Sequence, residues 1–231
     1  MTDIPTEPSP QPIQLTALEA RVLGSLIEKA ATTPEAYPLT LNSTQLACNQ
    51  KTSREPVMNA ELGAVGHTLK TLEEKKLVRQ TYGARVPRFE HTIDSALELT
   101  ARSRAIIGML QLRGPQTQAE LYTRTQRLAD FPDAEILGDT LDRLIAREPA
   151  LVVCIGRASG QREDRYMHTL CGPISIEMMT AARNSAKDDS HRNDLDRDDL
   201  DRVDLESRVA ELERIVVDLQ QKIDTMKNSA S

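Results

Sequence analysis

The chain contains an internal repeat. Residues 15–26 read LTALEARVLGSL and residues 99–110 read LTARSRAIIGML, so Leu, Thr, Ala, Gly and Leu recur at an offset of 84 positions. Two more matched blocks follow in the same order: GHTLKTL at 66–72 with GDTLDRL at 138–144, and RFEHTI at 88–93 with RYMHTL at 165–170. Self-similarity of this kind is the signature of a repeated architecture, and it predicts two copies of one small folding unit.

The first copy predicts three helices followed by a β-hairpin. Thr16 is a good N-cap with Glu19 at the capping-box position, and apolar residues then recur at helical spacing. A short second helix ends near Cys48, the stretch NQKTSREP forms a turn, and a third helix runs roughly from Asn59 to Lys75. LVRQTY and ARVPRFEHTI are two strands joined at Gly83.

The second copy repeats this pattern more compactly. Its first helix spans Leu99 to Leu112, Thr117 and Glu120 begin the second, and Asp133 opens the third. Three helices and a hairpin are the order of the winged helix, whose third helix usually enters the major groove of DNA. The sequence therefore predicts a mostly α protein with small β-hairpins (α+β): two tandem winged helix-turn-helix domains plus a C-terminal helix.

The composition changes sharply outside the repeat. The net charge is −6, yet residues 173–231 alone carry nine basic and fourteen acidic side chains, so the repeated units are close to neutral and free to hold a basic face. The predicted domains are a disordered tail at 1–14, winged-helix domains at 15–98 and 99–172, an acidic linker at 173–204, and a heptad helix at 205–227.

Cellular location is predicted from what the chain lacks. It has no run of 18 apolar residues and its first residues have no basic, apolar leader, so we expect neither a membrane span nor a signal peptide. Its three cysteines are an odd number at distant spacings, which suits a reducing compartment. We therefore expect a cytoplasmic protein.

Long unusual strings carry a family resemblance. The run EKAATTPEAYPLTLNSTQLACNQKTSREPVM from Glu28 to Met58, LRGPQT at 112–117 and RYMHTL at 165–170 resemble the signature of the YceH-like family of bacterial proteins. The resemblance covers roughly residues 15–172 and implies a tandem winged-helix fold. It implies no biochemical mechanism, and the acidic C-terminal extension departs from the compact family pattern.

The C-terminal residues predict self-association. Apolar residues separated by alternating steps of four and three form a heptad seam, with β-branched residues at every a position and Leu or Met at every d position, which favours a parallel two-stranded coiled coil. The alternative is a single amphipathic helix packed on its own chain. The seam consists of Leu205, Val209, Leu212, Val216, Leu219, Ile223 and Met226.

The first copy offers a candidate DNA surface. Basic side chains gather around its turn and wing, where they would meet phosphates beside base-reading side chains of the third helix. The alternative is an ordinary solvated surface, because acidic residues are interleaved. The predicted contacts are Lys51, Arg54, Asn59, His67, Lys70, Arg79, Arg85 and Arg88.

The third helix of the second copy is a poor candidate for DNA contact. It carries Asp133, Glu135, Asp139 and Asp142, which would repel phosphates. We expect this helix to face a protein partner or to take part in dimerisation.

The residues show no enzymatic constellation. His91 and His168 are repeat equivalents beside aromatic residues and are expected to be structural, Cys48 is expected in the core, and neither a metal site nor a cofactor motif is present in the sequence pattern. We therefore expect a non-enzyme: a dimeric protein that binds double-stranded DNA, such as a transcriptional regulator. The alternative is a protein-binding scaffold of paired winged helices, similar in architecture to the kleisin-binding subunits of bacterial condensin.

Overall fold

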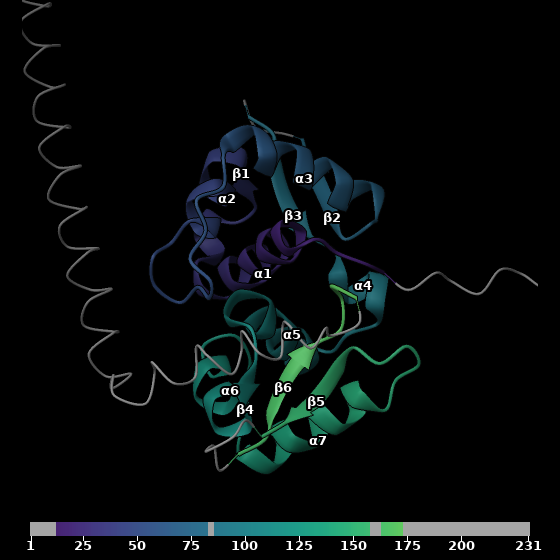
Figure 1. The fold of residues 1–231 in the computed structure, drawn as a ribbon. Coiled ribbons are helices and arrows are strands. Elements are labelled where there is room, and N and C mark those ends of the chain that lie inside the picture. Colours follow the sequence, from purple (N-terminus) through teal and green to yellow (C-terminus); the bar gives the residue numbers. More distant parts are fainter. Residues whose placement is uncertain (1–12, 83–85, 158–162, 173–231) are drawn as a thin grey trace, which may run out of the picture. The chain divides into compact units, whose positions relative to one another are not determined.

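The protein is mixed α/β. The computed structural model describes residues 13–82, 86–157 and 163–172, and within them helices accompany two small antiparallel sheets of three strands each (Figure 1). We call the described residues up to 98 the first half and those from 99 onward the second half. Their elements follow the same order, apart from two short helices that only the first half contains.

The first half begins with a long helix and ends with a short one. Its elements are α1 (Ala17–Thr32), the 3-10 helix η1 (Pro34–Ala36), β1 (Leu39–Thr40), α2 (Leu41–Cys48), α3 (Leu62–Glu74), β2 (Val78–Thr81), β3 (Arg88–His91) and α4 (Ile93–Leu97). The central strand of its sheet is β3, in the order β1-β3-β2.

The second half repeats this order without counterparts of η1 and α4. Its elements are α5 (Ala101–Arg113), β4 (Gln116–Thr117), α6 (Gln118–Thr125), α7 (Ala134–Ile145), β5 (Val152–Gly156) and β6 (Arg165–His168). Its sheet has the corresponding order β4-β6-β5, with β6 in the centre.

The strand register confirms the alignment of the two copies. His91 of β3 lies opposite Val78, and His168 of β6 lies opposite Val152. Two further matched pairs also occupy equivalent elements, namely Val22 with Ile106 on α1 and α5, and Leu69 with Leu141 on α3 and α7. All four of these apolar side chains are buried. The repeat in the sequence is therefore a repeat of element order and of core positions.

Threonine caps begin four of the helices. Thr16 and Thr117 form the predicted capping boxes: each backbone N–H donates to the carboxylate three residues ahead, and each hydroxyl accepts from that residue's N–H. Thr40 and Thr100 cap α2 and α5 through the hydroxyl alone. These side chains satisfy backbone donors that lack partners in the first turn of a helix, which fixes where each helix starts.

Two glycines let α1 and α5 pack closely. Gly24 and Gly108 are repeat equivalents, and each faces the opposite helix. A Cβ at Gly108 would lie 2.7 Å from Cγ2 of Ile27, and one at Gly24 would lie 3.0 Å from Cβ of Gln111. A Cβ at Gly108 would force Ile27 to shift, and one at Gly24 would be in tight contact, so glycine permits the close approach. The crossing joins the buried residues of both halves into one core.

Several predicted boundaries need correction. The third helix begins at Leu62 rather than Asn59, because Asn49 bonds both the N–H and the carbonyl of Ala60 and holds it outside the helix. Ile13, assigned to the tail, packs partly buried against the core. The rest of the tail, the linker at 173–204 and the heptad residues at 205–227 lie outside the described residues.

Candidate nucleic-acid interface

On its exposed side, α3 carries small, neutral and basic residues in its first turns and the acids Glu73 and Glu74 in its last turn. Val65, Leu69 and Leu72 are buried on one side of this helix, while Gly63, His67 and Lys70 are exposed on the other at spacings of four and three. Nothing lies within 4 Å of a Cβ placed at Gly63. The first two turns of α3 therefore present a face that another molecule can approach closely.

The matching face of α7 is acidic. At the offset of 72 between the two helices, Gly63 is replaced by Glu135, His67 by Asp139 and Lys70 by Asp142, and all three acids are exposed. The two helices thus share a place in the repeat but differ in charge at these three positions, where α3 has the single cation Lys70 and α7 has three acids. Elsewhere on their exposed sides, α3 carries Glu73 and Glu74 and α7 carries Arg143.

The predicted cations differ in availability. Lys51 is exposed in the segment before α3, and Asn59 is exposed nearby. Arg79 is two-thirds exposed, although its Nε donates to Oε1 of Glu90 across the sheet at 2.8 Å. Arg85 lies outside the described residues. Lys51, Asn59, His67 and Lys70 therefore remain the open polar side chains of the predicted set.

Arg88 and Arg54 serve the fold instead. Nη1 of Arg88 donates to the carbonyl of Pro38 at 2.7 Å, which ties β3 to the chain entering β1. Arg54 was predicted to reach a phosphate, but its side chain has no exposed surface. Because protein acceptors enclose its guanidinium, Arg54 is not available to contact DNA, and the prediction that it does is wrong.

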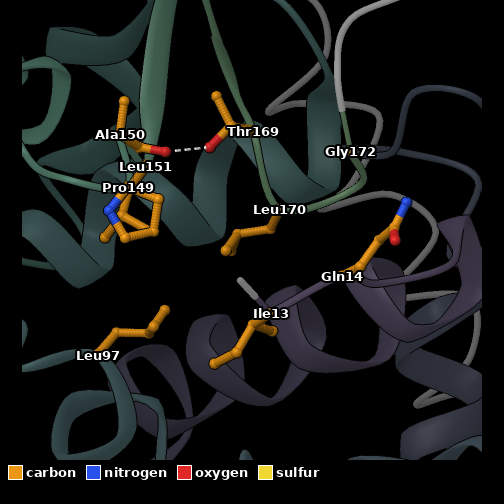
Figure 2. Close-up of a pocket in the computed structure, with 9 residues that line it drawn as sticks. All are labelled: Ile13, Gln14, Leu97, Pro149, Ala150, Leu151, Thr169, Leu170 and Gly172. Atoms are coloured by element: carbon orange, nitrogen blue, oxygen red, sulfur yellow. Dashed lines mark hydrogen bonds between the residues drawn. The ribbon is translucent and has the colours of Figure 1, made fainter. Parts of the chain in front are cut away.

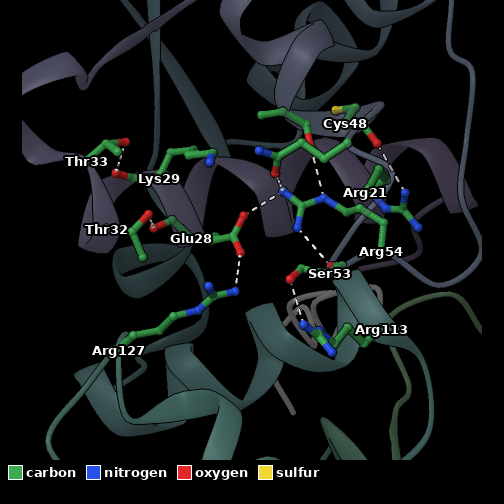
Figure 3. A network of polar contacts seen from close by, with 12 residues as sticks. Arg21, Glu28, Lys29, Thr32, Thr33, Cys48, Ser53, Arg54, Arg113 and Arg127 are labelled. Atoms are coloured by element: carbon green, nitrogen blue, oxygen red, sulfur yellow. Dashed lines mark hydrogen bonds and ion pairs between the residues drawn. The ribbon is translucent and has the colours of Figure 1, made fainter. Parts of the chain in front are cut away.

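Arg54 belongs to a buried ionic network that sequence reasoning missed (Figure 3). Its Nη2 lies 2.5 Å from Oε2 of Glu28, and its Nε donates to the carbonyl of Ala47 at 3.0 Å. The other oxygen of Glu28 accepts from Arg127 at 2.9 Å. Burial by itself raises the pKa of Glu28, but Arg54 and Arg127 outweigh it and hold that pKa below its ordinary value. The carboxylate of Glu28 is thus charged, and it binds one arginine from each half.

The repeated histidines lie on the central strands of the two sheets. The backbone N–H of His91 donates to the hydroxyl of Tyr37 at 2.7 Å, and the two rings are 6.1 Å apart. His168 is 3% exposed, and burial lowers its pKa to about 4. Cys48 is fully buried, in agreement with a core position. In the part of the chain that the structure describes, no three His, Cys, Asp or Glu side chains are grouped to hold a metal ion.

An apolar pocket of about 290 Å³ lies beside the start of the described chain (Figure 2). Ile13, Leu97 and Leu170 are among its lining residues. The hydroxyl of Thr169 points to the carbonyl of Ala150 and donates to it at 2.5 Å. The described lining contains no acidic, basic or thiol side chain, and its one hydroxyl, that of Thr169, is engaged by this backbone carbonyl.

Comparison with known proteins assigns the chain to a family. A family model described as a protein of unknown function, DUF480, matches residues 15–161. The chain belongs to the DUF480 family. A UPF0502 protein of Xanthomonas axonopodis pv. citri is 50% identical over 218 residues, 94% of each chain. A UPF0502 protein of Pseudomonas syringae pv. tomato is 47% identical over 216 residues, 94% of this chain and 96% of that protein. The bacterial family resemblance seen in the sequence is thereby confirmed.

The family match begins where the repeat begins, at Leu15. It includes Glu28 and Arg54, so the unusual run from Glu28 to Met58 contains both ends of the buried ion pair. None of the described helices is long and apolar enough to cross a membrane.

Proposed function

We propose that this protein binds double-stranded DNA through the exposed face of α3. In this proposal each half is a winged-helix unit, α3 enters the major groove, and the β2–β3 hairpin lies beside it as the wing. The element order and the central position of β3 and β6 support this assignment. The protein would act as a cytoplasmic regulator rather than as an enzyme.

The observation that carries the proposal is the chemistry of the α3 face. Gly63 lets the helix backbone approach a groove wall, while His67 and Lys70 supply donors to base edges or phosphates. Lys51 and Asn59 add polar side chains on the segment leading into the helix. The acidic face of α7 would be repelled by the same ligand, so one half reads DNA and the other does not.

A second candidate function has its own support. Leu46, Val57 and Leu62 are 55%, 56% and 40% exposed, although large apolar residues are usually buried. They come from α2, the following segment and the start of α3. Exposed apolar surface of this kind suits a protein partner, as in the alternative of a non-enzymatic scaffold. Pairing of two chains through the heptad seam at 205–227 is compatible with either function and stays a proposal.

The decisive test changes the charge of α3 alone. The variant His67→Asp/Lys70→Asp gives α3 the acidic side chains that α7 carries at these positions, and both sites are exposed, so the fold should be retained. We expect duplex affinity, measured by fluorescence anisotropy, to fall by about tenfold or more, and the salt dependence of binding to flatten by about one phosphate contact.

A matched control separates local contact from overall charge. The variant Ser95→Asp/Arg143→Asp alters exposed residues of α4 and α7 and shifts the formal charge by the same amount. It should bind duplex DNA nearly as well as the wild type. Equal weakening by both variants, or no binding of the wild type at low salt, would reject α3 as a DNA-reading helix.

A further inference from the structure

The segment that leads into α3 is held by the second half of the molecule. Residues 50–56 connect α2 toward α3, and the backbone N–H of Glu55 donates to the carbonyl of Leu112, at the end of α5, at 2.8 Å. Nη2 of Arg113 donates to the hydroxyl of Ser53 at 2.6 Å. Two hydrogen bonds therefore connect this segment of the first half to the C-terminal end of α5.

A charged contact strengthens this attachment (Figure 3). Arg54, within the segment, is held by Glu28 of α1, and the second carboxylate oxygen of Glu28 binds Arg127, which lies two residues after α6. The side chains of Glu28 and Arg54 are at most 4% exposed, whereas that of Arg127 is 46% exposed. The buried pair of Glu28 and Arg54 thus binds a second cation, Arg127, at the surface of the other half.

The repeat itself does not require this contact. The counterpart of Glu28 in the second half is Leu112, which has no charge, and the second half nevertheless forms the same sheet and helices. The attachment is consequently an addition to the shared framework. It acts only on the half whose α3 face we propose to contact DNA.

We propose that Arg127 is a positioning residue for α3: by binding Glu28 it fixes Arg54 and the segment 50–56, and so sets how the first half presents α3 to DNA. This inference rests on the proposed function. With Arg127 removed, one oxygen of a buried carboxylate loses its partner. Arg54 must then reorient to serve both oxygens or water must enter, and either change loosens the segment.

The test compares Arg127→Ala with Arg143→Ala in the full chain. Both remove one arginine from the second half, but Arg143 is an exposed residue of α7 outside the network. In Arg127→Ala we expect amide hydrogen exchange at Glu55 to be roughly three- to tenfold faster and duplex affinity to be weaker by a similar factor. Arg143→Ala should change neither, and Arg127→Lys should restore most of both because it keeps the charge.

The readouts separate this inference from the proposed function. Unchanged exchange at Glu55 in Arg127→Ala would overturn the positioning role even if the wild type binds DNA. Faster exchange with unaltered duplex affinity would overturn the link to α3. If the wild type binds no duplex, the DNA function fails and the positioning of a DNA-reading helix fails with it, whereas faster exchange would still establish the contact between the halves. A fall in affinity that merely follows a fall in thermal midpoint would also count against a positioning role.

Discussion

Helices α3 and α7 occupy equivalent places in the two halves, but only their buried sides agree. Leu69 and Leu141 fill the same core position, and the hydroxyls of Thr68 and Thr140 both donate to the carbonyl four residues earlier. On the exposed sides, His67 and Lys70 of α3 stand where α7 has Asp139 and Asp142. Folding therefore constrains one face of each helix and leaves the opposite face free to differ in function.

The two repeated arginines, Arg88 and Arg165, are among the residues that folding constrains. Arg88 donates to the carbonyl of Pro38 at 2.7 Å, and its equivalent Arg165 donates to the carbonyl of Pro115 at 2.8 Å. The same bond occurs in both halves although their charged faces differ. An arginine that recurs in both copies is thus better explained by the sheet that it anchors than by a ligand.

One buried position at which the two halves differ in charge is Glu28, whose counterpart is the apolar Leu112. Glu28→Leu would leave Arg54 buried without its carboxylate, and breaking a buried pair in this way costs about 3–5 kcal/mol of folding free energy. Denaturant unfolding of the full chain measures the loss. A double variant, Glu28→Leu/Arg54→Met, should recover part of it because both charges are then removed. A loss below about 1 kcal/mol in the single variant would contradict a stabilising role for the pair.

The acid response of the wild type follows from the same pair. The folded protein holds the pKa of Glu28 below its ordinary value of 4.5, so its stabilising contribution is complete above that value and is lost as the pH falls through the folded pKa. Glu28→Leu should lack this acid-dependent loss.

The repeat allowed much of the fold to be predicted from sequence. Capping residues, apolar stripes and matched blocks are local signals, and they gave the two sets of helices, both hairpins and the core positions of Leu69 and Leu141. The two-residue strands β1 and β4 and the short helix α4 were missed, because such elements depend on pairing and packing partners far along the chain. The predicted start of α3 is too early, since the side chains of Gln45 in α2 and of Asn49, its C-cap, hold Ala60 outside the helix.

Long-range contacts also limited the prediction of the site. Arg54 sits in a polar turn and has the sequence context of a surface cation, but Glu28 lies 26 residues away and Arg127 lies in the other copy. One signal was available: Glu28 and Arg54 both belong to the unusual run that resembles the family signature. The contrast between the exposed faces of α3 and α7 could be read from sequence, because helical spacing alone defines it.

The two repeated histidines should differ in their effect on stability. Burial lowers the pKa of His168 to about 4, whereas His91 is only half-buried and the lowering of its pKa by burial is opposed by Asp94. Because the folded pKa of His168 lies below the ordinary 6.5, its stabilising effect is complete above pH 6.5 and is lost as the pH falls toward 4. The loss over this window is about 3 kcal/mol, and His168→Leu should remove most of it in urea titrations at each pH. His91→Leu should remove less; an equal effect of both variants would contradict the difference in burial.

The smallest predicted effects compare two glycines that differ in surroundings. Gly108→Ala would place a Cβ 2.7 Å from Ile27, a buried and β-branched side chain that has little freedom to move, whereas nothing lies within 4 Å of that atom at Gly63. Alanine favours a helix over glycine by about 1 kcal/mol, but overpacking costs about 1–3 kcal/mol. Gly108→Ala should therefore lose up to about 2 kcal/mol in denaturant unfolding, while Gly63→Ala should gain about 0.5–1 kcal/mol. If both variants were stabilised alike, α1 and α5 would not cross as closely as described. If both were destabilised, the face of α3 would not be open, and its proposed approach to a DNA groove would lose its physical basis.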